Sequence, residues 1–355
     1  MRPTLIQYLR CPACQAPLRW TEPYATQWIE HGELICTHCN QCYCIRKGIA
    51  YIYVDNDDWK RLATEASGWV QMAKDAGCYD QTHVDIDFRL PYVASEPWPE
   101  IAYQFDLILS IIRPKPHSRV LDLGAGRGWA AKQFAIRGCD VVAVEINDDD
   151  QIGVGRSLAL MQQASVSYDI LIANSQHLPL ADQSYDIVFA SAALHHSTSL
   201  EKVVREAARI LRRGGKLVAI HEPCIADHIT PEQDAPNIAR ETAYHIQELR
   251  PKLDDYRRAL QQAGLRELAM FHHETYGVTV EKLQAWSKKN NLPPLTEQQM
   301  RDLQRNRRFS LHHIARTIQS RFKRRPDPAL LPPQAWMDQF YRRCGGNLTL
   351  ISERL

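Results

Sequence analysis

Three glycines at alternate positions, Gly124, Gly126 and Gly128, follow a short apolar run, and a helical pattern begins directly after them. Glycine allows the chain to turn sharply and a ligand to approach the backbone, and the first N–H groups of a helix have no partner within it. A second apolar run ends at Glu145, whose carboxylate can accept hydrogen bonds from two ribose hydroxyls. This strand, turn, helix and strand predict a nucleoside-binding site.

The spacing of the glycines distinguishes two kinds of nucleoside site. A dinucleotide-binding turn, G-x-G-x-x-G, would need its third glycine at Trp129, where a bulky residue prevents close packing of helix on strand. The run from Asp122 through the glycines instead resembles the first motif of the class I S-adenosylmethionine-dependent methyltransferases, and Glu145 falls at that family's ribose-binding acid. The resemblance implies that Asp122, the three glycines and Glu145 bind S-adenosylmethionine. A turn without a ligand is the alternative.

A second segment extends the resemblance. The thirteen residues from Asn174 to Asp186, NSQHLPLADQSYD, resemble the acid, LPF-type turn and D-x-S-F-D that follow the third strand in this family. Where the family has an Asp that accepts a bond from the adenine amino group, this sequence has Asn174, whose amide oxygen is also an acceptor. The resemblance implies that Asn174 and Ser175 hold the adenine. Because Asn suits loops, a turn residue is the alternative for Asn174.

Polar residues follow the next two expected strands, at the edge where an open α/β sheet binds its ligands. Ser191, which is assigned to the cofactor, follows the first strand. The pair His195-His196 comes shortly after it, and the L-H-H motif that contains the pair resembles that of the ubiquinone/menaquinone-type methyltransferases. His196 is expected to orient or deprotonate a substrate hydroxyl, while a packing role for one of the two histidines is the alternative. His221 and Glu222 follow the second strand, as candidate bases or acceptor ligands or as solvent-facing loop residues.

Two other reaction schemes have less support. Cys224 follows a proline, as the nucleophile of some cytosine-C5 methyltransferases does, but nothing in the sequence indicates a lowered pKa for its thiol. The stretch 191–194 lacks the Asp/Asn-Pro-Pro-Tyr run, which argues against methylation of the exocyclic amino groups of nucleobases. These residues leave the methyl acceptor unidentified.

Six of the ten cysteines lie between residues 11 and 44, and four of them form two C-x-x-C pairs separated by 21 residues. This spacing is typical of four thiolates around a structural, tetrahedral Zn²⁺, in a segment too small to fold without the metal. Residues 32–49 resemble the zinc ribbon of the small activator subunit that partners several tRNA, rRNA and protein methyltransferases. The expected ligands are Cys11, Cys14, Cys36 and Cys39, with Cys42 and Cys44 as the alternatives.

The chain of 355 residues has a net charge of only +2, so its composition does not indicate a general polyanion binder. No apolar run approaches the roughly 20 residues of a membrane span, and the first residues lack a signal-peptide core, so a cytoplasmic protein is expected. The segment 281–325 differs, because twelve Lys and Arg against three acids give it a net charge of +9. It predicts a helical element that contacts RNA or phosphate, or a solvated basic face. The oligomeric state is not predicted.

Together these patterns predict an α/β protein with the Rossmann-like seven-stranded sheet of the class I methyltransferases. The expected parts are a zinc ribbon over 1–55, a helical linker or cap over 56–113, an S-adenosylmethionine-binding domain over 114–276 and 344–355, and a basic helical insertion over 277–343. The predicted function is O- or N-methylation of a small metabolite, sugar or lipid-linked intermediate. The alternatives are an RNA methyltransferase and, third, a non-catalytic module that binds a partner.

Overall fold

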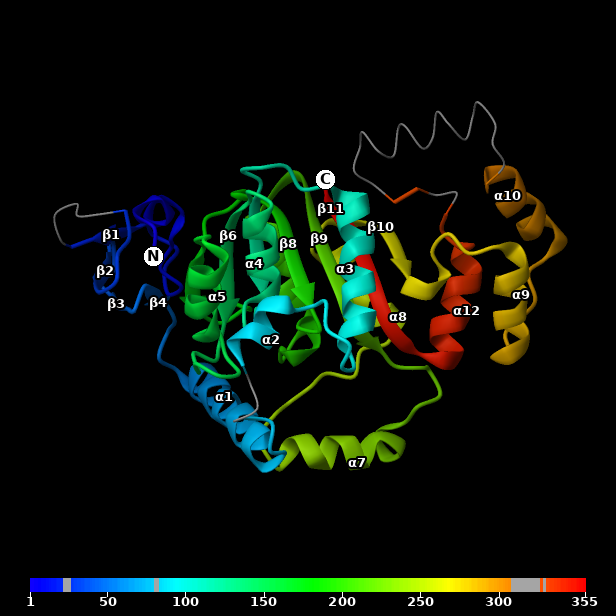
Figure 1. Cartoon of the computed structure of the whole chain (residues 1–355), viewed down its shortest axis with the longest axis horizontal. Coiled ribbons are helices and arrows are strands. Elements are labelled where there is room, and N and C mark those ends of the chain that lie inside the picture. Colours follow the sequence, from blue (N-terminus) through cyan, green and yellow to red (C-terminus); the bar gives the residue numbers. More distant parts are fainter. Residues whose placement is uncertain (22–26, 80–82, 308–325, 328–329) are drawn as a thin grey trace.

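The computed structural model describes residues 1–21, 27–79, 83–307, 326–327 and 330–355, and it is built around one large sheet (Figure 1). Within these residues the strand order is β1-β2-β3-β4-β7-β6-β5-β8-β9-β11-β10. Strands β4 to β9 of this order run parallel, and β11 runs antiparallel to both β9 and β10. The seven strands that follow the N-terminal segment, called the central strands although β10 lies at the edge, are β5 (Arg119–Leu123), β6 (Asp140–Glu145), β7 (Asp169–Ile172), β8 (Tyr185–Ser191), β9 (Leu211–Cys224), β10 (Leu265–Phe271) and β11 (Gly346–Arg354). The predicted seven-stranded sheet is confirmed.

Helices cover both faces of the sheet, because its strands are apolar on both sides. On β5, Val120 packs into one hydrophobic core, whereas Leu121 and Leu123 pack into the other, as the two-residue period of a strand requires. The core that contains Val120 is covered by α3 (Trp98–Ile112), α4 (Trp129–Ile136) and α5 (Arg156–Ala164). The opposite core is covered by α6 (Leu200–Ile210) and α8 (Leu253–Gln262).

The cysteine-rich N-terminal segment extends the central sheet. After a short 3-10 helix, Pro3–Tyr8, it forms β1 (Leu18–Trp20), β2 (Gly32–Cys36), β3 (Cys42–Arg46) and β4 (Ile49–Tyr51). Strand β4 pairs in parallel with β7, so hydrogen bonding continues from the ribbon into the central sheet. Arg2 reinforces this junction through an ion pair of 2.9 Å with the buried carboxylate of Asp169 on β7.

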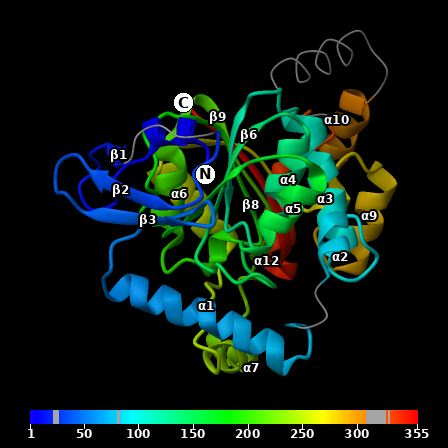
Figure 2. The same ribbon diagram turned by 60° about the vertical axis from the view of Figure 1, so that its left-hand side comes forward.

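Two helices lie below the carboxyl ends of the parallel strands and meet near their ends, α1 (Asp57–Asp75) and α7 (Pro231–Thr242) (Figures 1 and 2). The side chain of Asn56 caps α1 by accepting a hydrogen bond from the backbone of Trp59 at 2.9 Å. The segment after α7 packs against α1, where the hydroxyl of Tyr244 donates to Asp75 at 3.0 Å. A short helix, α2 (Val84–Arg89), lies against α5.

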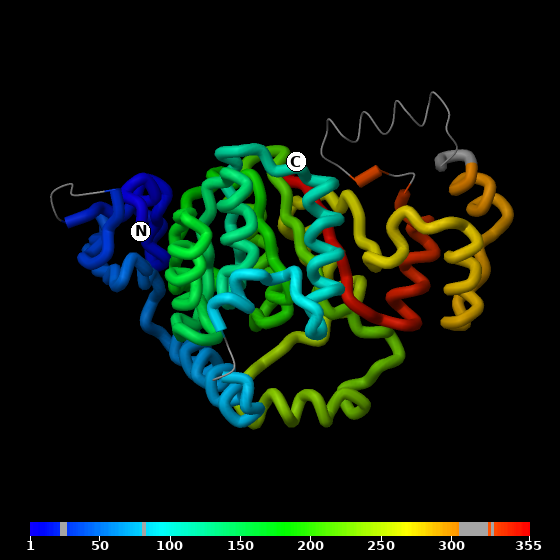
Figure 3. Tube along the Cα trace, viewed as in Figure 1, coloured from blue at the N-terminus to red at the C-terminus, as the bar shows by residue number. Residues whose placement is uncertain are grey.

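The chain between β10 and β11 forms a helical insertion at the end of the sheet farthest from the ribbon (Figure 3). Its described helices are α9 (Val280–Lys289), α10 (Glu297–Arg307) and α12 (Gln334–Cys344), which bury Leu283 and Trp336 among their apolar residues. Much of the expected basic helical element, residues 308–325, lies outside the described residues. Among the helices that the structure describes, none is long and apolar enough to cross a membrane.

Candidate active site and metal centre

A cavity of about 860 Å³ lies at the carboxyl ends of β5, β6 and β8. Its size is in the range of small-molecule sites. One side of the wall consists of the loops that follow these strands, and α1 with the segment after α7 forms the other side. The cavity brings together six of the residues predicted from the sequence, namely Gly124, Gly126, Glu145, Ser175, Ser191 and His196.

The glycine turn presents backbone to the cavity at Gly126. Its φ is +51°, and no described atom lies within 4 Å of the place that a Cβ would occupy. At Gly124, by contrast, a Cβ would lie 2.6 Å from that of Ala193 in the loop after β8. The turn therefore needs glycine for two reasons: close packing at Gly124, and at Gly126 a left-handed backbone conformation that leaves room for a ligand.

The carboxylate of Glu145 is fixed at the end of β6. Its Oε2 accepts a hydrogen bond from the backbone N–H of Gly126 at 2.8 Å, and its Oε1 accepts one from Ile146 at 2.8 Å. Burial raises the pKa of Glu145, and these N–H donors partly oppose that shift. The acceptor-only carboxylate lies beside the open backbone of the turn, which is the chemistry that a ribose diol requires.

Asp122 and Gly128 lie behind the turn and do not line the cavity. Oδ2 of Asp122 accepts a hydrogen bond from the N–H of Ala131 in α4 at 2.8 Å, and burial raises the pKa of Asp122 to about 7. Gly128 begins α4 with φ +79° and packs against Ser157 of α5. Both residues therefore hold α4 in place beneath the turn, which corrects the expectation that they contact the cofactor directly.

Residues of the loop after β7 line two different pockets. Ser175 lines the cavity, together with Gln176, which the sequence did not single out. The amide oxygen of Asn174 accepts from the backbone N–H of Gln176 at 2.8 Å, and its side chain lines a small separate pocket with Tyr53 and Trp59. The alternative interpretation of Asn174, a turn residue, agrees with this placement, and the adenine assignment for its side chain does not.

The two histidines after β8 have different environments. His196 lines the cavity, and its burial there lowers its pKa to about 3, so the imidazole is neutral at pH 7. His195 is buried, with Nδ1 2.9 Å from Oε2 of Glu222. The other oxygen of Glu222 accepts from the N–H groups of Ala193 and Leu194 at 2.8 and 2.9 Å. Glu222 is fully buried and does not line the cavity, so it positions the histidine turn instead of touching substrate.

The other polar residues at the end of β9 also lie away from the cavity. His221 faces α3, where its Nδ1 is 3.3 Å from Oε1 of Glu100 and its backbone N–H donates to Gln104. The catalytic role expected for His221 is therefore not supported by its position. Cys224 is buried, and burial raises its pKa to about 12, so the thiol is not an activated nucleophile.

Several cavity residues have no signal in the sequence motifs. Glu65 and Trp69 project from α1, while Glu241 and Glu248 come from α7 and the segment that follows it. Burial raises the pKa of Glu65 to about 7, although Arg61 opposes the shift. These residues belong to helices and loops without a recognisable sequence motif. The helical cap expected over 56–113 was the one prediction that included part of this wall.

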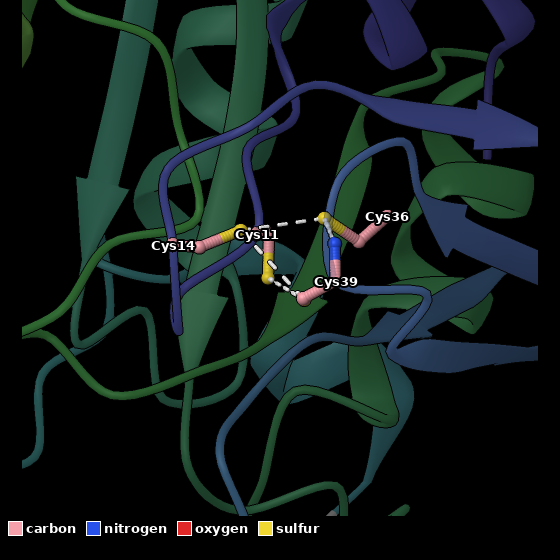
Figure 4. Close-up of side chains that lie close together, drawn as sticks. All are labelled: Cys11, Cys14, Cys36 and Cys39. Carbon is pink, nitrogen blue, oxygen red and sulfur yellow. Dashed lines mark hydrogen bonds between the residues drawn. The ribbon is translucent and has the colours of Figure 1, made fainter.

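Four cysteines of the ribbon converge on one point (Figure 4). The Sγ atom of Cys14 lies 3.4 Å from that of Cys36 and 3.6 Å from that of Cys39, and the Sγ atom of Cys11 lies 3.6 Å from that of Cys39. Four sulfurs around a tetrahedral zinc ion would be about 3.8 Å apart, so the side chains fit such an ion. Burial opposes ionisation of Cys36, but N–H groups of Cys39 and His38 outweigh it and lower its pKa to about 6. Cys42 and Cys44 lie outside this cluster.

The sheet order, with an antiparallel last strand and a glycine turn at the cavity, defines a Rossmann-like fold of the class I methyltransferase type. Residues 121–219 match the family described as methyltransferase domain, and residues 2–48 match the family described as Trm112p-like protein. The chain therefore joins a class I S-adenosylmethionine-dependent methyltransferase domain to an N-terminal Trm112p-like ribbon.

Three curated relatives resemble part of the chain. A sterol 24-C-methyltransferase of Schizosaccharomyces pombe is 33% identical over 38% of this chain and 34% of the relative. A sarcosine/dimethylglycine N-methyltransferase of Halorhodospira halochloris is 29% identical over 44% of this chain and 55% of the relative. A demethylmenaquinone methyltransferase of Renibacterium salmoninarum is 31% identical over 32% of this chain and 44% of the relative. The chain thus spans between about a third and just over half of the length of these relatives.

Proposed function

We propose that the protein is a methyltransferase that transfers the methyl group of S-adenosylmethionine to a small molecule. The observation that carries the proposal is the meeting of Gly126, Glu145 and His196 in one cavity at the carboxyl ends of the parallel strands. The names of the three relatives point the same way, because each describes a methyltransferase for a small molecule. O- or N-methylation of a metabolite, sugar or lipid-linked compound is the finer proposal.

The cavity residues suit the parts of the cofactor. Glu145 would accept the ribose hydroxyls, Gly124 and Gly126 would pack against the amino-acid part, and Ser175 would lie at the adenine. When bound, S-adenosylmethionine supplies a methyl carbon on a positively charged sulfur, so no protein nucleophile is required. Ser191 lines the same cavity and is also assigned to the cofactor.

The remaining wall would hold the methyl acceptor. His196 is neutral there and its imidazole can accept a hydrogen bond, which would orient an acceptor hydroxyl toward the methyl group. The ring of Trp69 meets that of His196 edge-on at 5.3 Å and restricts its position. Carboxylates of Glu241 and Glu248 also line the cavity, as does Arg240. The two carboxylates outnumber this cation, and they favour a neutral or cationic acceptor over an anionic one.

We also propose that the four cysteines bind a structural Zn²⁺. All four positions of a tetrahedral ion would be filled by thiolates, which leaves no open position for catalysis. The ribbon strands are short, and the ion would supply much of the energy that folds them.

Calorimetric titration with S-adenosylhomocysteine tests the cofactor assignment. Glu145→Gln keeps the size of the side chain but removes its charge, and hydrogen bonds to a charged acceptor are stronger by about 1 to 1.5 kcal/mol each. For two ribose hydroxyls we expect binding to weaken roughly 30- to 150-fold. Glu297→Gln, an exposed residue of the insertion, is the matched control and should bind like the wild type. Equal affinities for all three proteins would contradict the assignment.

Transfer of a labelled methyl group into a cell extract tests the acceptor class. We expect label in the small-molecule fraction and not in the RNA or protein fractions. RNA is the alternative acceptor because of the basic segment, yet none of the described residues of the insertion lines the cavity. Label found in RNA alone would overturn the small-molecule proposal.

A further inference from the structure

Three side chains with metal-binding groups meet at the wall of the cavity, where His196 and Glu248 line the cavity and His195 is buried behind them. One ligand atom from each of His195, His196 and Glu248 lies within 4.8 Å of the other two. Nδ1 of His196 is 3.8 Å from Oε1 of Glu248, a separation that a shared ion could bridge. Two imidazoles and one carboxylate suit divalent first-row transition metals, and three protein ligands leave positions open for another ligand.

The hydrogen bond between His195 and Glu222 orients the imidazole of His195 for metal binding. The carboxylate of Glu222 already accepts two backbone N–H bonds, is fully buried, and lies 2.9 Å from Nδ1 of His195. A carboxylate accepts a hydrogen bond from Nδ1–H, so the proton stays on Nδ1 and the lone pair of Nε2 is free to bind a metal. Metal-bound histidines almost always donate their other N–H to a carboxylate, a carbonyl or water in this way.

His196 supplies an independent observation. Its Nδ1 is buried and has no hydrogen-bond partner among the described residues. Buried polar atoms are normally paired, so this nitrogen is available to an ion or a water molecule as its partner. The carboxylate of Glu248 is the nearest charged group that the structure shows beside this nitrogen, at a distance too long for a hydrogen bond.

The position of Glu248 is fixed by its neighbours. The N–H of Leu249 donates to the carbonyl oxygen of His195 at 2.7 Å, which ties this segment to the histidine turn. Arg250 pairs with Glu248 at 3.2 Å but also with Asp234 and Glu241. One positively charged guanidinium is therefore shared among three carboxylates. The excess of negative charge beside the two imidazoles favours a cation.

We propose that Nε2 of His195, Nδ1 of His196 and a carboxylate oxygen of Glu248 bind a divalent transition-metal ion such as Zn²⁺. The proposal rests on the proposed function and narrows the acceptor to compounds with a metal-binding oxygen, because His196 and Glu248 line the same cavity. With Nδ1 of His196 bound to the cation, the cation would replace the imidazole as the group that orients this oxygen, and it would make a hydroxyl at this position more acidic.

The zinc content of the full-length protein tests the site. After dialysis against Zn²⁺, we expect elemental analysis to find one more ion per chain in the wild type than in either His196→Gln or Glu248→Gln. His228→Gln, which changes an exposed histidine outside the cavity, is the matched control and should keep the wild-type content. The difference between proteins is the measured quantity, so the occupancy of the cysteine cluster does not affect it. Equal zinc in the wild type and both variants would overturn the site.

Two further measurements separate the possible outcomes. Glu222→Gln should weaken zinc binding about 10- to 100-fold, since it perturbs the residue that orients His195. Titration of the same samples with S-adenosylhomocysteine reports on the cofactor half of the cavity. Equal zinc with intact cofactor binding overturns the metal site alone, whereas the additional ion without cofactor binding overturns the proposed function and leaves the metal site supported.

Discussion

Gly128, the residue that caps the start of α4, has little room for a side chain. A Cβ there would lie 1.9 Å from Oγ and 3.1 Å from Cβ of Ser157, which is completely buried on α5. The hydroxyl can rotate away, but the Cβ moves only with its helix. The left-handed φ of +79° costs an L-residue about 1–2 kcal/mol, and overpacking a core adds about 1–3 kcal/mol. We therefore expect Gly128→Ala to destabilise the protein by about 2–5 kcal/mol.

Gly264 provides the control for the free-energy cost of the left-handed backbone conformation. Its φ is +70°, and no described atom lies within 4 Å of its Cβ position. Gly264→Ala should therefore carry only the cost of about 1–2 kcal/mol for the left-handed conformation. Urea unfolding followed by tryptophan fluorescence measures both variants against the wild type. The reasoning fails if Gly128→Ala is as stable as Gly264→Ala within about 0.5 kcal/mol.

Four other perturbations have defined outcomes. Gly126→Ala should lose only about 1–2 kcal/mol in urea but bind S-adenosylhomocysteine at least about tenfold more weakly in calorimetry, because the added methyl group enters the cavity. Burial raises the pKa of Asp122 from 3.8 to about 7, so its contribution to stability is present below pH 4 and lost as the pH rises to 7. Between pH 5 and pH 8 the wild type should lose about 3 kcal/mol more than Asp122→Asn, and equal losses in urea would contradict this. Asp169→Asn breaks the ion pair with Arg2 and should cost about 1–3 kcal/mol in urea unfolding, whereas Asp140→Asn, at an exposed partner 3.5 Å away, should cost less than about 1 kcal/mol. A zinc chelator should lower the thermal midpoint, and added Zn²⁺ should restore it; an unchanged midpoint would argue against a structural ion.

The sequence was informative where a site is built from consecutive residues. The glycine turn and the strands on either side of it are local features, and the order of the seven central strands agrees with the predicted fold. Parallel strands place their carboxyl ends at one edge of a sheet. Residues as far apart in the chain as Gly126, Glu145 and His196 could therefore be assigned to one site before any contact was known.

Side-chain direction explains the residues that were misplaced. On β5, Asp122 alternates with Leu121 and Leu123, so it faces α4 and not the ligand. On β9, His221 has a φ of +56°, which breaks the regular alternation just before Glu222. A sequence motif predicts that a residue lies at the end of a strand, but it does not predict toward which face of the sheet the side chain points. Glu248 depends on contacts between distant segments, which no local pattern encodes.

The ribbon is connected to the cavity both by the pairing of β4 with β7 and by a short segment of chain that leads into α1. Strand β4 ends at Tyr51 beside β7, and α1 begins at Asp57, so the helix that closes the cavity follows the ribbon almost directly. The same short connection carries Tyr53, which stacks on Trp59 with ring centroids 3.7 Å apart and lines the small pocket beside the loop after β7. A strand hydrogen-bonded into the sheet fixes the start of α1 relative to that loop. The ribbon therefore fixes, through β4, the place where α1 begins relative to the loop after β7, and residues of both α1 and that loop line the cavity.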